Sequence, residues 1–338
     1  MPQPARPTLR CLRQDLSEDW DDARQRAALD DEPAALPPFH KLAHPVVRHA
    51  ASVYDGTADT DAQREGITGL TNPMWLKLKT GRWRGAVWED DAGQPWLCAA
   101  GLRREYESSD FYARFMSDVL SGGPEQFLPT PADRHRLRLE QAEAALAAWE
   151  QRLHQDACDA LSAAHEAGSA TFAVPGLRDG SPGLSTADVT VVVLDEDDDP
   201  DGGVAELVVA FARTDWAHLD LAEHADLIVL AAVHPDEQSW DVSSLATGPI
   251  YSLVMSPAEL AALLAAADRH GTPGATSPGA TAHYAHRGHL TASSVNGTSV
   301  RGLCGKWFVP RQDHDSMPKC DRCDAVMRTM KEAEAARG

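Results

Sequence analysis

The chain has 338 residues, of which 43% are hydrophobic and 24% are charged, and it carries a formal net charge of −20. A chain of this length can form two or three domains, each with its own core. Its longest apolar run, residues 227–233, is far shorter than the ~20 residues that cross a bilayer, and its first residues lack the apolar core of a signal peptide. We therefore expect a cytoplasmic protein that does not bind a membrane.

The negative charge is concentrated in the middle of the chain. Residues 186–248 contain fifteen acidic residues and one basic residue, Arg213, whereas residues 283–338 contain nine basic and six acidic residues. The simplest role of the acidic middle is solubility. The net charge therefore does not exclude nucleic-acid binding by other parts of the chain.

The N-terminal third predicts a lead-in followed by a mixed domain. Residues 1–37, rich in Pro, Asp and Arg, predict a loosely ordered segment with one short helix at 17–29. Residues 38–125 predict an α+β hairpin domain. Its expected elements are a helix at 42–54, a second helix ending near 72–81, a hairpin over 82–104 with its turn at 91–93, and a helix capped by Ser108 or Ser109.

Basic residues alternate with aromatic residues in the predicted hairpin. The candidate nucleic-acid ligands are Lys79, Arg82, Arg84 and Arg103. In a strand, Arg82 and Arg84 would share one face and Trp83 the other. Basic side chains on one face can bind phosphates while nearby rings stack on bases. An ordinary hairpin is the alternative, with its arginines paired to Glu89, Asp90 or Glu105.

The order helix, helix, basic turn, hairpin and "GLR" over residues 60–120 is similar to the RelE/ParE toxin superfamily. These small α+β proteins act on ribosome-bound mRNA or on gyrase. In the mRNA-cleaving branch, Lys, Arg and Tyr side chains stabilise the phosphate and move protons. The resemblance therefore adds Tyr112 to Lys79, Arg82, Arg84 and Arg103 as candidate residues of a ribonuclease.

Residues 128–270 predict a central α/β-type domain. It begins with a long helix that has Thr130 as its N-cap and Pro131 in its first position and stops at Gly168. Strand-like runs follow at 170–174, 187–194, 204–212, 227–233 and 250–256, and Ser256 with Glu259 predicts a capping box for a last helix. Residues 271–282, rich in Gly, Pro, Ser, Thr and Ala, predict a linker.

Two further patterns have ordinary explanations. Asp197, Asp199 and Asp201 have the spacing that opens an EF-hand loop, but Val208 stands where the bidentate Glu belongs, so we expect an acidic turn. His40, His44 and His49 lack a nearby carboxylate or cysteine that would complete a metal site.

The C-terminal segment has the strongest chemical signal. Three of the six cysteines, Cys304, Cys320 and Cys323, lie within twenty residues of one another, and the other three are scattered. Thiolates bind zinc tetrahedrally, and a CxxC turn directs two sulfurs to one metal. The fourth ligand is one of the histidines of "HYAHRGH" at 283–289. A redox pair is the alternative, but no thioredoxin-like pattern flanks this CxxC.

The segment "HYAHRGHLTASSVNGTSVRGLCGKWFVPRQDHDSMPKCDRC" resembles a small actinobacterial domain family of unknown function. The shared features are a His-Tyr pair, Leu-Cys-Gly-Lys, an aromatic-Val-Pro run and Pro-x-Cys-x-x-Cys. This resemblance implies that His283 is the fourth ligand beside Cys304, Cys320 and Cys323. It also implies that His286 and His289 are surface residues, and it brings no known activity.

We therefore expect a multi-domain α+β protein that ends in a zinc-ribbon-like module at 283–330 with structural Zn²⁺. The leading hypothesis is binding to RNA or to a nucleoprotein such as the ribosome. The alternatives are a RelE-like ribonuclease and an adaptor whose acidic central domain binds a basic protein.

Overall fold

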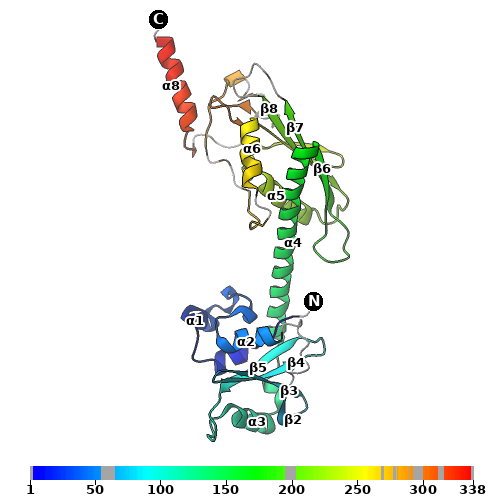
Figure 1. Cartoon of the computed structure of the whole chain (residues 1–338), viewed down its shortest axis with the longest axis vertical. Helices are drawn as coiled ribbons and strands as arrows, with labels where there is room; N and C mark the ends of the chain where they lie inside the picture. The colour runs from blue at the N-terminus through cyan, green and yellow to red at the C-terminus, as the bar shows by residue number, and fades with distance from the viewer. Residues whose placement is uncertain are drawn as a thin grey trace. The chain divides into compact units, whose positions relative to one another are not determined.

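The computed structural model describes residues 3–54, 65–194, 203–267, 270–276, 279, 281–288, 290–291, 300–310 and 316–335. Both helices and sheets are present, so the predicted α+β class is confirmed. The chain forms two compact units, Met1–Ala142 and Glu143–Gly338, and their boundary falls within the long helix α4 (Pro131–Ala167), labelled in Figure 1. None of the helices in these ranges combines the length and apolar content needed to span a bilayer.

The first unit contains a five-stranded sheet with the order β1-β5-β4-β3-β2. The strands are β1 (Arg6–Pro7), β2 (Gly66–Thr71), β3 (Met74–Thr80), β4 (Trp83–Glu89) and β5 (Pro95–Leu102). β1 is parallel to β5, and the other neighbours are antiparallel. The predicted hairpin is therefore confirmed as β4 and β5.

Residues 72–81, predicted to end a helix, instead form β3 and the turn before it, so that prediction was wrong. Leu76 and Leu78 are buried, whereas Lys77 and Lys79, between and after them, are more exposed. Successive side chains of a strand point to opposite faces. The alternation of Leu and Lys therefore fits a strand with one face toward a core.

Helices cover both faces of this sheet. On one face, α2 (Pro45–Val53) packs in a core with Leu78 and Leu97. On the other face, Phe115 of α3 (Phe111–Gly122) contacts Trp75 edge to face. The N-cap of α3 is Asp110, whose carboxylate accepts the N–H of Tyr112, and not Ser108 or Ser109 as predicted.

The lead-in predicted for residues 1–37 is packed and not loose. Leu12 and Leu16 are fully buried in the core shared with α2, and the N–H of Ala5 donates to the carbonyl of Tyr54 (2.9 Å). Its helices are η1 (Cys11–Asp15), α1 (Ala23–Asp31) and η2 (Pro33–Ala35), followed by η3 (Phe39–Lys41). The apolar residues are too sparse to show a period, and they are buried because the sheet provides a surface for them.

The first turns of α4 belong to the first unit. The N–H of Asp133 donates to Thr130 Oγ1 (3.2 Å), as the predicted cap requires, and the N–H of Leu9 donates to Asp133 Oδ1 (2.7 Å). Further along the helix, buried Glu140 pairs with buried Arg6 (3.1 Å). Because of these contacts, the boundary lies after residue 142 and not at the predicted 125–128.

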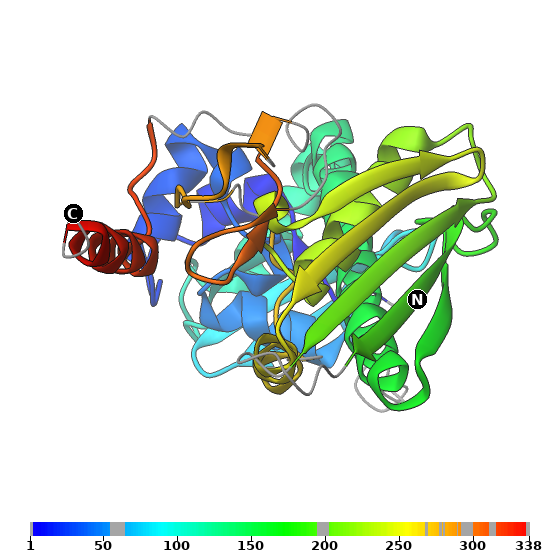
Figure 2. The same ribbon diagram turned by 90° about the horizontal axis from the view of Figure 1, so that it is seen from above.

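The second unit contains an antiparallel sheet with the order β6-β7-β8-β10-β9, and Figure 2 shows these strands side by side. The strands are β6 (Ser169–Val174), β7 (Ser185–Leu194), β8 (Val204–Arg213), β9 (Asp241–Leu245) and β10 (Gly248–Met255). Four of the predicted strands are confirmed, and β9 was not predicted.

The remaining predicted strand, at residues 227–233, is instead the last part of helix α5 (Leu219–Val233), so that prediction was wrong. Ala222, Ala225, Val229 and Val233 are buried at helical spacing. A short apolar run does not distinguish a strand from a buried helix, and here the run continues a helix that begins eight residues earlier. Helix α6 (Pro257–Ala266) has the predicted capping box. The sheet, α4, α5 and α6 share one apolar core.

The C-terminal segment contains β11 (Val300–Arg301), β12 (Trp307–Phe308) and helix α8 (Asp321–Ala335), which was not predicted. It belongs to the same compact unit as the central sheet. Lys306 Nζ donates to Asp236 (2.8 Å), and in the predicted linker Thr276 Oγ1 donates to Glu237 (2.6 Å). The described parts of residues 271–282 therefore pack on the unit and do not isolate the C-terminal segment.

Candidate functional site

Backbone hydrogen bonds bring the residue before His283 beside the CxxC turn. The N–H of Cys320 donates to the carbonyl of Ala282 (2.9 Å), and the N–H of Ala282 donates to the carbonyl of Pro318 (2.9 Å). Ala282 and Lys319 are accordingly bridged in parallel. This pairing positions His283, the next residue, beside Cys320.

The other two sulfurs come from a tight turn and from a helix start. Cys304 lies between β11 and β12, where the N–H of Gly302 donates to the carbonyl of Lys306 (2.8 Å). Gly305 has φ +89°, a conformation that favours glycine. Cys323 lies in the first turn of α8, so that both CxxC sulfurs are held at the N-terminus of that helix.

The ligand atoms of His283, Cys304, Cys320 and Cys323 all lie within 4.8 Å of one another. Nδ1 of His283 is 3.3 Å from Cys304 Sγ and 3.8 Å from Cys323 Sγ. In a tetrahedral site with Zn–S and Zn–N bonds of about 2.3 and 2.0 Å, the sulfur and nitrogen are about 3.5 Å apart. These residues can therefore hold one metal ion.

Burial and the N-terminus of α8 have opposite effects on the pKa values of the thiols. Burial raises the pKa of Cys304 to about 11 in the absence of a metal. Burial is the largest single influence on Cys320 and acts to raise its pKa. Hydrogen bonds from the backbone N–H groups of Cys323 and Arg322, together with those from the neighbouring thiols, outweigh it, so the pKa lies below its ordinary value. Cys320 is therefore more ready to ionise than Cys304, and a bound cation would favour the thiolate form of Cys304 as well.

The structure places two histidines of "HYAHRGH", His283 and His286, as the resemblance implied. His283 is in the cluster and packs beside the ring of Phe308 (centroids 5.2 Å apart), whereas His286 is exposed. His289 lies outside the described residues, as do Asp197, Asp199 and Asp201.

The three N-terminal histidines do not form a metal cluster within the described residues. His44 is a structural residue, since its Nδ1 accepts the N–H of Val46 at the start of α2 (3.3 Å) and its ring lies between Trp20 and Trp83.

Three of the four candidate nucleic-acid ligands line one cavity in the first unit. Lys79, Arg84 and Arg103 surround a space of about 520 Å³ together with Lys77 and Tyr112. Lys79 and Arg84 are direct cross-strand neighbours in β3 and β4. Lys77 belongs to the same run of basic residues but was not among the four candidate ligands. Its alternation with Lys79 could have identified it.

Arg82, the fourth candidate, lies apart from this cavity. It donates to Asp19 (2.6 Å) and Glu18 (3.3 Å), and Asp19 also accepts the indole N–H of Trp83 (2.8 Å). The expectation that Arg82 and Arg84 act from one face is therefore not met. Arg82 has acidic partners, as the ordinary-hairpin alternative proposed, but they are not the carboxylates it named.

The cavity's own cations differ in their partners. Lys77 and Lys79 both pair with Glu65, and the hydrogen bond from Lys77 is the main cause that lowers the pKa of Glu65 to about 2. Arg103 donates to Asp110 (2.6 Å) and to Glu105 (3.4 Å), a carboxylate that the ordinary-hairpin alternative named, whereas Arg84 donates to backbone carbonyls.

Comparison with known proteins adds one finding. The family model described as "Protein of unknown function (DUF3039)" matches residues 277–330, the segment that contains the four metal-ligand candidates. No curated protein and no solved structure gives a significant match to the chain. The similarity of residues 60–120 to the RelE/ParE superfamily stays a prediction.

Proposed function

We propose that His283, Cys304, Cys320 and Cys323 bind one structural Zn²⁺. The observation that supports this is the convergence of one imidazole and three sulfurs within 4.8 Å. Three sulfurs favour zinc over the hard cations, which prefer oxygen, and four protein ligands leave no open position for a substrate. All six cysteines are free of disulfides, which agrees with a reducing compartment such as the cytoplasm.

The zinc would hold together chain segments that have little core of their own. β11 and β12 have two residues each. The metal would link their turn to His283 and to the start of α8. Because Lys306 follows Cys304 closely and pairs with Asp236, the zinc would also secure the contact between this segment and the central sheet.

Metal analysis of matched histidine variants tests the proposal. Protein purified without chelator should carry about one zinc per chain. His283→Ala should lose most of it, whereas His286→Ala, which changes an exposed histidine three residues away, should retain it. No zinc in the wild type would refute the site, and loss of zinc from His286→Ala alone would refute the ligand set.

We also propose, as a second function, that the cavity of Lys77, Lys79, Arg84, Arg103 and Tyr112 binds a phosphate of RNA. The hydroxyl of Tyr112 is buried and makes no hydrogen bond to the described residues. Burial also raises the pKa of Tyr112, so the hydroxyl keeps its proton. A phosphate oxygen in the cavity would accept from Tyr112. It would also face the guanidinium of Arg84, which donates to backbone carbonyls and pairs with no carboxylate of the residues that the structure describes.

The two arginines of the hairpin provide a matched pair for the test. Arg84→Ala should weaken binding of single-stranded RNA and reduce the salt dependence by about one phosphate contact. Arg82→Ala should change neither, because Arg82 lies outside the cavity and pairs with Asp19. Cleavage of the bound RNA, abolished by Arg84→Ala, would favour the ribonuclease. No RNA binding by the wild type at low salt would refute the proposal and favour an adaptor with a basic protein partner.

A further inference from the structure

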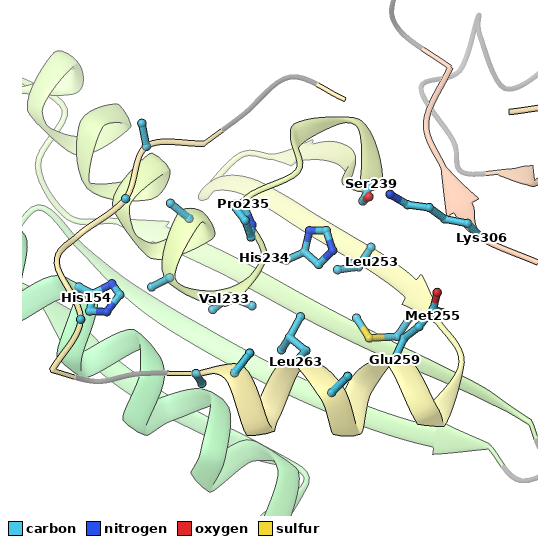
Figure 3. Close-up of a pocket in the computed structure, with 18 of the residues that line it drawn as sticks. His154, Val233, His234, Pro235, Ser239, Leu253, Met255, Glu259, Leu263 and Lys306 are labelled. Carbon is cyan, nitrogen blue, oxygen red and sulfur yellow. The ribbon is translucent and has the colours of Figure 1, made fainter. Parts of the chain in front are cut away.

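The second unit contains a larger cavity, which none of the sequence patterns indicated. Its volume is about 730 Å³, within the range of pockets that bind small molecules. Figure 3 shows the cavity between β10, α6 and the end of α5, with the segment at residues 271–275 along its rim. Lys306 reaches it from the C-terminal segment.

The walls of this cavity are mainly apolar. Leu253 and Met255 of β10 and Val233 of α5 contribute buried side chains, and Leu263 of α6 lies opposite them (Figure 3). The remaining wall positions on α5 and α6 are largely alanines. These short side chains leave the space open, because larger ones at the same positions would fill it.

Three polar groups, His234, Ser239 and Lys306, gather toward one end in Figure 3, and His154 of α4 lines the opposite end. His234 Nδ1 accepts the N–H of Asp236 (3.3 Å), so the proton of the neutral ring is on Nε2. Burial lowers the pKa of His234, which favours this neutral form. Nε2–H is therefore a hydrogen-bond donor carried by a ring that lines the cavity.

Charge at this end does not favour an anion. The ammonium of Lys306 is already balanced by Asp236 (2.8 Å). Glu259 adds a second carboxylate, which is occupied in the capping box of α6 through Ser256. A ligand carboxylate would therefore meet two fixed negative charges and one positive charge, whereas an uncharged acceptor would meet the donors of His234 and Lys306 without this repulsion.

We propose that this cavity binds a small, uncharged, mainly apolar molecule that carries a carbonyl oxygen, with the carbonyl directed at His234 and Lys306. The apolar body would lie against Leu253, Met255 and Leu263, where burial of its surface supplies most of the affinity. The hydrogen bond to Nε2–H would set its orientation. This site is independent of the RNA-binding cavity in the first unit.

The test uses full-length, zinc-loaded protein and prodan, an uncharged naphthalene ketone whose emission shifts to the blue in apolar surroundings. Wild-type protein should bind it saturably with a blue shift. Ala262→Trp, which places an indole in the cavity, should abolish this binding. Ala261→Trp is the matched control, since Ala261 is the adjacent exposed residue of α6 and does not line the cavity. Equal binding by both variants would refute the site.

A second variant tests the orientation. His234→Phe keeps a ring but removes the Nε2–H donor, and also the Nδ1 that accepts from Asp236. Prodan affinity should fall about three- to tenfold, as expected for one hydrogen bond, and naphthalene controls for any disturbance caused by the loss of Nδ1. Naphthalene, which has no carbonyl, should bind both proteins equally. Displacement of prodan by decanoate at lower concentration than by the neutral ketone 2-decanone would overturn the assignment to uncharged ligands.

Discussion

Replacing Glu140 with Ala tests how the N-terminal segment is joined to α4. The Glu140 carboxylate accepts hydrogen bonds from Arg6 (3.1 Å) and Arg136 (2.9 Å), and the Arg6 side chain is only 1% exposed. Without the carboxylate, the charge of Arg6 stays buried and loses its partner. Breaking a buried pair in this way costs about 3–5 kcal/mol, so the free energy of opening of the first unit should fall by about that amount.

Hydrogen exchange on the full-length protein measures this loss separately for each unit, because local opening is read from individual segments. Protection should fall in β1, β5 and α2 and stay unchanged in β7 and β8. Glu143→Ala, on the exposed part of the same helix, is the control. Adding Arg6→Met to Glu140→Ala should restore part of the stability, since it removes the unpaired charge. The reasoning is refuted if Glu140→Ala opens no more readily than Glu143→Ala.

Two further predictions concern the metal and a buried histidine. Removal of zinc by a chelator should increase hydrogen exchange at residues 300–310 and 316–335. It should also weaken prodan binding several-fold, because the turn that holds Lys306 depends on Cys304. Unchanged hydrogen exchange in these residues would contradict a structural metal. Burial lowers the pKa of His44 from its ordinary value, so the unfolded chain takes up the proton first as the pH falls. The stability of the first unit should therefore be complete above about pH 6.5 and fall toward pH 5 by up to about 1.4 kcal/mol per pH unit. His44→Asn keeps an N-cap acceptor for Val46. Its free energy of unfolding, measured in urea by hydrogen exchange, should change less with pH than that of the wild type.

The metal cluster could be predicted because its chemistry is local in sequence. The CxxC spacing fixes two sulfurs through the first turn of one helix, and the glycine after Cys304 indicates a tight turn. The choice among the histidines was different. Spacing left His283, His286 and His289 as alternatives. The pairing of Ala282 with Lys319, a contact between distant residues, places His283 in the cluster.

Errors in the predicted elements came from patterns that have two physical readings. The apolar run at 227–233 is compatible with a strand or a buried helix, and the preceding Ala222 and Ala225 determine that it is helical. In residues 1–37, Leu12 and Leu16 are buried against a sheet that lies later in the chain. Local composition shows only that this segment is rich in Pro and charged residues. It therefore predicted a loosely ordered segment, whereas tertiary contacts make it ordered.

The two cavities could not be predicted from the sequence, because a cavity forms where side chains leave space between elements that only the fold brings together. The basic cavity follows from the register of β3 on β4, because Lys79 stands directly opposite Arg84 once that pairing is known. The apolar cavity, in contrast, cannot be deduced from the pairing of any two strands. Its alanines on α5 and α6 have the same sequence pattern as alanines that pack tightly, such as Ala222 and Ala225. Whether an alanine closes a core or leaves a pocket depends on the distance to the opposite wall, here β10 and Lys306. That distance is set by the whole unit, so a binding site of this kind becomes visible only after the fold is known.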